Sequence, residues 1–247
     1  MRKVYIIWLR EIKKYIRSKS RVIGTLGMPL LFLFVLGFGL KSRISVNNGD
    51  YLDFIFPGII AMSVLFTSMF SGISVIWDKQ FGFMKEMLVA PISRTKIMVG
   101  KTLGGATTAV FQGFLIFMLS LLMGIRIHSF SGFIVALAFM ALIGISFTAL
   151  GISFGSRMED MQAFPLVMNF VIMPLFFLSG ALFPLEGVPK ILRMIALINP
   201  LTYGVDALRF GLVGISQIPL WIDFIVLAGF CVLTISVGTY LFNKTSV

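Results

Sequence analysis

The stretch LSGALFPLEGVPKILRMIALINPLTYGVDALR, residues 178–209, decides how the rest of this chain is interpreted. Pro184, Pro189 and Pro200 interrupt it too often for one membrane-spanning helix. The spacing of its apolar residues predicts two short helices instead, of which the first covers about 188–198 and is amphipathic. The stretch is therefore expected to enter one membrane face and return.

The second predicted helix follows the last of these prolines. Asn199 is placed to cap it and Pro200 to begin it. Asp206 and Arg209 then lie one helical turn apart, where they can pair, and a charge pair at membrane depth needs a protein-lined or wet surrounding. We expect residues 184–212 to form an external re-entrant hairpin, whose charge pair either pins it in place or gates a transport path. The candidate hairpin and gate residues are Pro184, Asn199, Pro200, Tyr203, Asp206 and Arg209.

Composition indicates an integral membrane protein. Hydrophobic residues make up 58% of the 247 residues, and the mean hydropathy is +0.99, well above the range of soluble domains. The net charge of +11 is spread over short segments between apolar runs, which favours anionic lipid headgroups over nucleic acid as a partner. The single cysteine, Cys231, and the single histidine, His128, leave no disulfide framework within the chain and no metal cluster.

Six apolar segments are long enough to cross a hydrocarbon core of about 30 Å as helices. A basic amphipathic segment, 1–21, precedes them and is expected to lie in the headgroup plane. The predicted fold is an all-α, single transmembrane domain. Its predicted spans are 22–40, 54–77, 103–125, 130–154, 163–183 and 218–242.

The distribution of Lys and Arg predicts that both termini are cytoplasmic. With the N-terminus inside, the cytoplasmic segments hold fifteen of the 21 basic residues. A seventh span through the hairpin would carry Arg193, Asp206 and Arg209 across lipid, so we reject it.

The cytoplasmic loop 78–101 reads DKQFGFMKEMLVAPISRTKIMVGK. Pro91 is expected to end a short helix at about 84–89, and Ser93 to cap the next helix. A short helix with mixed charged and apolar side chains, held between two span ends, is suited to docking a soluble partner.

Both stretches resemble the signature of type-2 ABC exporter permeases, and among them the daunorubicin-resistance permease family. Gln80 departs from that family, which more often has an acid there. In the hairpin the matching residues are Leu178-Ser179-Gly180, Phe183-Pro184, Asn199-Pro200-Leu201-Thr202-Tyr203 and Asp206-Ala207-Leu208-Arg209. In the loop they are Phe81-Gly82-Phe83, Lys85-Glu86-Met87-Leu88-Val89-Ala90-Pro91, Ser93-Arg94 and Gly100-Lys101.

The resemblance implies half of a transport path, completed by a second copy of the chain and driven by two separate ABC ATPase subunits. It implies that this chain is not an enzyme and binds no cofactor, because ATP and Mg²⁺ belong to the ATPases. The implied cargo is a lipophilic, drug-like or antibiotic-type molecule, and a lipid-linked glycan is the alternative. The implied ATPase-coupling residues are Gly82, Lys85, Glu86, Leu88, Pro91 and Arg94.

Two other classes of protein are less consistent with the sequence. An ion-driven transporter would carry buried acids or histidines in mid-span and an inverted repeat. A lipid-modifying enzyme would gather acids or histidines at one interface, whereas the internal acids lie on predicted docking loops. Those acids are Asp78, Glu86, Glu159 and Asp160.

Three features within the spans carry further expectations. Asp223 lacks an obvious partner near the start of the last span, and a solvated or snorkelled carboxylate is favoured there over a proton site. Pro165 and Pro174 are expected to kink the fifth span. A stripe of small residues at about four-residue spacing predicts close helix packing, and its members are Gly144, Thr148, Gly151 and Gly155.

Overall fold

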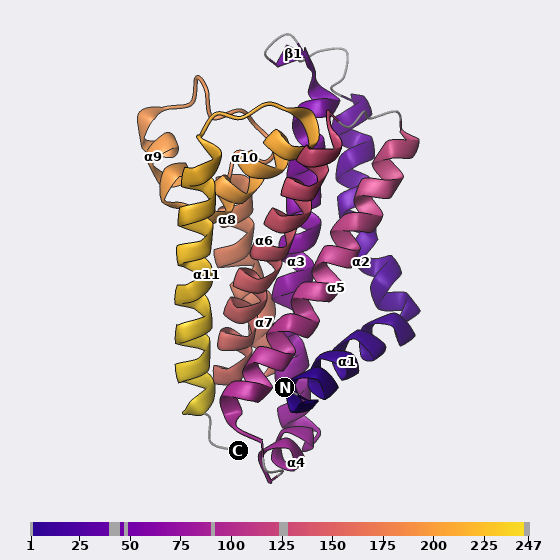
Figure 1. Cartoon of the computed structure of the whole chain (residues 1–247), viewed down its shortest axis with the longest axis vertical. Helices are drawn as coiled ribbons and strands as arrows, with labels where there is room; N and C mark the ends of the chain where they lie inside the picture. The colour runs from indigo at the N-terminus through magenta and orange to yellow at the C-terminus, as the bar shows by residue number, and fades with distance from the viewer. Residues whose placement is uncertain (1, 40–44, 47–48, 90–91, 124–127, 245–247) are drawn as a thin grey trace.

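Four long helices form the body of the molecule and run along its long axis (Figure 1). Each is long and apolar enough to cross a membrane, and the first of them in the chain is the most buried. The computed structural model describes residues 2–39, 45–46, 49–89, 92–123 and 128–244. The four helices are α3 (Tyr51–Gln80), α5 (Arg94–Leu122), α6 (Phe130–Arg157) and α11 (Leu220–Asn243).

One end of the bundle carries an N-terminal helix and a short helix between two long ones (Figure 1). The start of the first helix and the end of the last helix lie at this same end. The elements here are α1 (Arg2–Arg17) and α4 (Phe83–Val89), and α2 (Lys19–Phe32) leads from α1 along the bundle into a π-helical segment, η1 (Leu33–Phe38).

The opposite end carries the hairpin and a small antiparallel strand pair (Figure 1). The strand pair is a minor departure from the expected all-α fold. The two helices of the hairpin meet at an angle of 87°. These elements are α9 (Lys190–Ile198), α10 (Pro200–Val213), β1 (Ser45–Val46) and β2 (Gly49–Asp50).

The described residues contain four to six candidate membrane spans, depending on whether each bent helix pair counts as one. The predicted short helix of the cytoplasmic loop is present as α4. The third predicted span, 103–125, begins inside α5, which runs without a break from Arg94 to Leu122. Ser93 stands at the N-cap position of this helix, as expected, although its side chain makes no capping hydrogen bond.

The fifth predicted span, 163–183, contains a broken helix, in line with the kinks expected at its prolines. Its helical part covers Met161–Phe177 and is divided into short segments. Pro165 and Pro174 each stand at the start of one of these short α-helices, as expected for a residue that lacks the backbone N–H donor. The segments are η2 (Met161–Ala163), α7 (Phe164–Val167), η3 (Met168–Ile172) and α8 (Met173–Phe177).

The small-residue stripe of α6 packs as predicted. A Cβ added to Gly155 would lie 2.3 Å from the carbonyl oxygen of Gly72, and one added to Gly72 would lie 2.2 Å from that of Gly151. Helices α3 and α6 therefore touch backbone to backbone, which only glycine permits at these positions. This close crossing brings the end of α3 into a fixed place beside the end of α6.

Candidate functional site

The α1 and α4 end of the molecule contains a buried cluster of charges. Asp78, in the last turn of α3, and Lys101 of α5 are 1% and 2% exposed and form an ion pair. Lys101 also pairs with Glu11 of α1, with Nζ 3.3 Å from Oε1. Two further cations of α1 reach the same carboxylate, because Arg10 Nη2 and Lys14 Nζ lie 3.1 and 3.8 Å from Asp78 Oδ1. Buried charges of this kind are retained only when each has a partner.

Arg10 connects this charge cluster to α4. Its guanidinium lies 5.6 Å from the centroid of the Phe83 ring, and its Nη1 donates to the sulfur of Met87 at 3.6 Å. One side chain of α1 thus contacts both α4 and the end of α3. The charge cluster and α4 therefore share the side chain of Arg10.

Helix α1 is held against α5 by close packing as well as by charge. A Cβ on Gly104 would lie 2.6 Å from Glu11 Cβ, so the glycine allows the helices to approach. Trp8 Nε1 donates to Thr107 Oγ1 at 3.0 Å, and the Tyr15 hydroxyl bonds to the side-chain oxygen of Gln112. The expectation that 1–21 only lies in the headgroup plane is incomplete, because one face of α1 packs on the bundle.

The predicted coupling residues lie around α4. Gly82 precedes the helix with φ of 79°, a left-handed conformation that favours glycine. Glu86 is exposed on α4, and Arg94, the first residue of α5, donates to the carbonyl oxygen of Asn243 at 2.5 Å. Lys85 and Leu88 lie within α4, whereas Pro91 lies outside the described residues.

Gln80, the departure from the family pattern, also has a defined contact. Its side-chain amide donates to the carbonyl oxygen of Glu159 at 3.0 Å, and Lys79 Nζ donates to that of Ser156 at 2.8 Å. These bonds join the end of α3 to the turn after α6. The uncharged side chain of Gln80 is therefore sufficient to hydrogen-bond the end of α3 to the turn after α6.

The hairpin forms as its sequence predicts at the junction of its helices. Asn199 caps α10, because its Oδ1 accepts from the Leu201 N–H at 3.0 Å, and Pro200 is the first residue of the helix. The Asn199 amide also donates to the carbonyl oxygen of Leu175 at 2.6 Å. The Tyr203 hydroxyl donates to that of Leu197 at 2.7 Å. The junction is thus tied to both α8 and α9, with Pro184 in the turn that leads into α9.

Asp206 and Arg209 are buried, at 3% and 4% exposure, and their contact with each other is long. Arg209 Nη1 lies 4.0 Å from Asp206 Oδ1, whereas Arg209 Nη2 donates to the carbonyl oxygen of Gly180 at 3.0 Å. The guanidinium also lies 4.0 Å from the centroid of the Phe54 ring. The strongest contacts of Arg209 are therefore with α3 and with the loop before α9.

Asp206 holds the segment between α10 and α11. Its carboxylate accepts from the backbone N–H groups of Gln217 at 3.1 Å and Ile218 at 3.0 Å, and from the Ser216 hydroxyl at 3.1 Å. Charge-assisted bonds to backbone N–H groups are among the stronger hydrogen bonds in proteins. The two hairpin charges thus fasten two different loops to α10.

The environment of Asp223 differs from the one that the sequence predicts. It is fully buried, and neither carboxylate oxygen has a hydrogen-bond partner among the residues that the structure describes. A solvated carboxylate is therefore wrong for this position. The sequence placed it near a helix start, where exposure is usual, but the packing of α11 against α6 and α10 encloses it.

Comparison with known proteins identifies the family of this chain. The model of the family described as ABC-2 type transporter matches residues 2–213. The chain belongs to the ABC-2 type transporter family. It is a membrane permease of that family and a multi-pass plasma membrane protein, and membership implies an ABC ATPase as partner.

Individual relatives agree with this assignment. The inner membrane transport permease YadH of Escherichia coli K12 is 31% identical over 231 residues, which are 92% of this chain and 89% of YadH. The putative transport permease ycf38 of Cyanophora paradoxa is 29% identical over 214 residues, 85% of this chain and 74% of its own length. Nodulation protein J of Rhizobium leguminosarum bv. viciae is 27% identical over 216 residues, 86% of this chain and 80% of its own length.

The charge cluster was not predicted from the sequence of this ABC-2 permease. The sequence places Asp78 and Lys101 at the two ends of a docking loop and indicates no contact between them. A weak signal was present, because Glu11 is the single acid among the eight basic residues of 1–21. A lone acid in so basic a helix is a candidate partner for a cation on another helix.

Proposed function

We propose that this permease is the membrane subunit of an ATP-driven exporter, in which two copies of the chain work with two separate ATPase subunits. Both termini and α4 face the cytoplasm in this proposal, and the α9–α10 hairpin is re-entrant from outside. ATP and Mg²⁺ bind to the ATPases. The observation that carries the proposal is Arg10 of α1, which contacts both α4 and the end of α3.

The charge cluster supports coupling for a mechanical reason. An ATPase that moves α4 pushes on Arg10, and Arg10 is bonded to Asp78 at the base of the central helix α3. Because Asp78 is also paired with Lys101, the displacement reaches α5 at the same time. Three helices are therefore driven as one unit.

The proposed cargo is a lipophilic, drug-like or antibiotic-type molecule that passes between the two copies. The charged residues of the four long helices lie near the helix ends, as with Asp53 and Arg157. A path formed by the apolar middle sections suits an uncharged lipophilic molecule. Export of a lipid-linked glycan by the same architecture is the competing outcome of a transport assay.

Glu86→Lys is expected to uncouple transport from ATP hydrolysis while leaving the permease folded. Glu86 is exposed on α4, and reversing its charge at a complementary interface costs several kcal/mol. We expect cargo-stimulated ATPase activity in proteoliposomes to fall by about tenfold or more. Glu186→Lys, an equal charge change at the opposite end, is the control and should keep full stimulation. Wild-type stimulation in Glu86→Lys would mean that α4 does not carry the coupling.

A further inference from the structure

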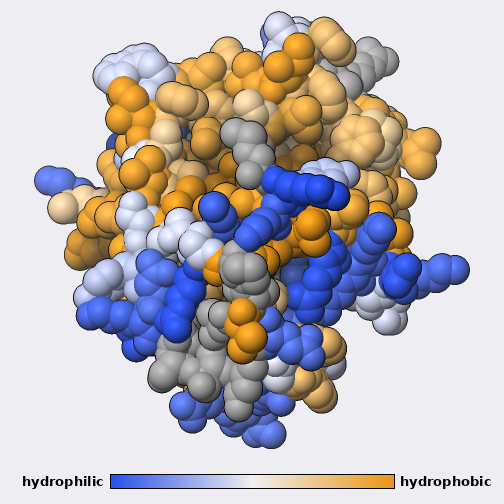
Figure 2. Space-filling view, turned by 60° about the horizontal axis from the view of Figure 1, so that its bottom comes forward, coloured by the Kyte–Doolittle hydropathy of each residue, from blue (hydrophilic) through white to orange (hydrophobic). Residues whose placement is uncertain are grey.

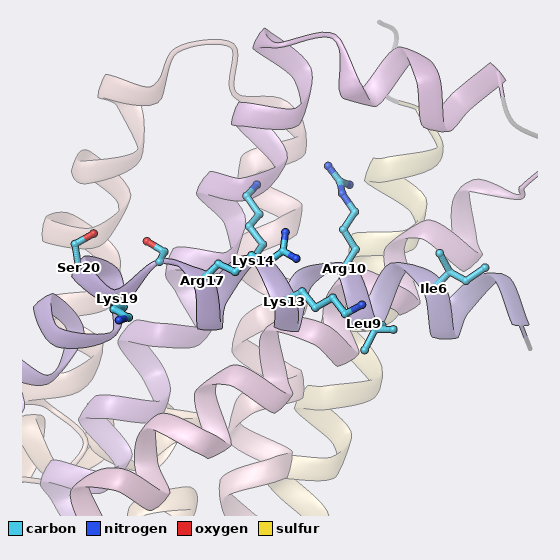
Figure 3. A pocket seen from close by; sticks show the side chains of 9 residues that line it. Ile6, Leu9, Arg10, Lys13, Lys14, Arg17, Lys19 and Ser20 are labelled. Carbon is cyan, nitrogen blue, oxygen red and sulfur yellow. The ribbon is translucent and has the colours of Figure 1, made fainter.

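A basic hollow lies where α1 meets α2. Its volume is about 980 Å³, and it is lined by one face of α1 and the first residues of α2 (Figure 3). Among the residues that the structure describes, no acidic side chain lines it. Five of its nine lining side chains are cationic, and these are Arg10, Lys13, Lys14, Arg17 and Lys19.

Three of these cations are not neutralised. Arg10 and Lys14 share the carboxylate of Asp78. Within the part of the chain that the structure describes, no acid lies within 4.0 Å of Lys13, Arg17 or Lys19. The basic hollow therefore presents a concave surface of uncompensated positive charge, which attracts an anion.

An apolar groove lies between α2, α3 and the broken helix α7–α8. Its volume is about 690 Å³, and none of the described side chains that line it is charged. Methionine and phenylalanine dominate its wall, including Met28, Phe66, Phe70 and Met168. Unbranched and aromatic side chains of this kind form an adaptable surface for flexible hydrocarbon.

The basic hollow and the apolar groove adjoin along one face of α2. Ser20 lines the basic hollow, and Gly24, one helical turn further, lines the apolar groove together with Met28 after another turn. Figure 2 shows hydrophilic side chains gathered over this end of the molecule, with hydrophobic surface directly beyond them. One elongated ligand can therefore occupy both.

We propose that the basic hollow and the apolar groove together form a binding site for one anionic phospholipid from the leaflet that meets α1. The phosphate lies in the basic hollow against Lys13, Arg17 and Lys19, and the acyl chains lie in the apolar groove. A free anion would use only the hollow, and an uncharged lipid only the groove. Anionic lipid is the class that complements both surfaces. The binding of this lipid does not depend on the ATPase.

Native mass spectrometry of the purified permease tests the charge half of the site. The permease is incubated with an equal mixture of phosphatidylglycerol and phosphatidylcholine of identical chains, and retained lipid is counted. We expect selective retention of phosphatidylglycerol. The double variant Lys13→Gln, Arg17→Gln should weaken phosphatidylglycerol retention by about 30-fold, because each juxtamembrane charge contributes about fivefold to lipid binding. The pair Lys190→Gln, Arg193→Gln on exposed α9 removes the same charge elsewhere and should leave retention unchanged.

Two glycines of α2 test the apolar half. A Cβ added to Gly24 or to Gly27 meets nothing within 4 Å, so Gly24→Leu and Gly27→Leu should both fold. Only Gly24 lines the groove. We expect Gly24→Leu to reduce phosphatidylglycerol retention several-fold and Gly27→Leu to leave it intact, because only the former fills the space for the acyl chains.

Several results would overturn the proposal. Equal retention of the two lipids would remove the charge selectivity, and equal loss in both charge-removed pairs would make the effect non-specific. Displacement of the lipid by excess inorganic phosphate, with no effect of Gly24→Leu, would identify a free-anion site instead. Wild-type retention in Gly24→Leu would show that the acyl chains lie elsewhere.

Discussion

Lys101→Met is expected to destabilise the permease by about 3 to 5 kcal/mol, because it removes one partner of a buried ion pair. Asp78 would keep Arg10 and Lys14, but Glu11 would lose the only cation within 4.0 Å of it in the described residues. The contacts of α1 with α5 should loosen in consequence. Thermal unfolding of the detergent-purified permease, followed by tryptophan fluorescence, measures the loss.

Two further variants make this test specific. Lys96→Met removes an exposed cation from the same helix and should change stability by no more than about 0.5 kcal/mol. The double variant Asp78→Asn, Lys101→Met should lose less stability than the sum of the losses in the two single variants. The double variant removes both charges of the pair, so neither Asp78 nor Lys101 is left facing a missing partner. Strict additivity would contradict the ion pair as the source of the effect.

Asp206→Asn is the second substitution with a large expected effect. The neutral amide cannot accept the same charge-assisted bonds from the N–H groups of Gln217 and Ile218, and Arg209 would lose its nearby negative charge. We expect a loss of about 3 to 5 kcal/mol, within the range for a broken buried pair. Hydrogen exchange at positions 217 and 218 should rise at the same time, because those amides lose their acceptor.

Stability and transport measured on the same samples distinguish two roles of the Asp206–Arg209 pair: a pin, which only holds the hairpin in place, and a gate, which controls the transport path. The contacts of Asp206 and Arg209 with separate loops favour the pin, so transport per folded molecule should be unchanged in Asp206→Asn and Arg209→Gln. A gate predicts variants that remain as stable as wild type but leak or stall. The exchange of the two charges, Asp206→Arg with Arg209→Asp, should not restore stability, because arginine cannot accept from the backbone N–H groups. Arg193→Gln on exposed α9 serves as the matched control.

Local features of this fold follow from the sequence because their signals are local. The Asn199 cap, the proline at the start of α10 and the short α4 each depend on neighbours within a few residues. The close packing at Gly151 and Gly155 also follows from their spacing, although the spacing does not say that α3 is the helix that packs there.

The charge cluster could not be derived in this way. Its acids and bases come from positions 10, 11, 14, 78 and 101, on three helices, and the lone acid Glu11 does not reveal that α1 packs on α5. Asp223 shows the same limit, because its burial depends on which face of α11 meets α6 and α10. Periodicity assigns a residue to a helix face but does not say which neighbour covers that face.

The most direct test of the proposed function is purification of the affinity-tagged permease after co-expression with an ABC ATPase subunit encoded beside it. The account predicts a complex of two permeases and two ATPases by mass photometry. In proteoliposomes this complex should move a lipophilic fluorescent dye only with ATP and Mg²⁺, and Glu86→Lys should abolish that movement. A permease that purifies without an ATPase and moves the dye in response to an ion gradient alone would contradict the account.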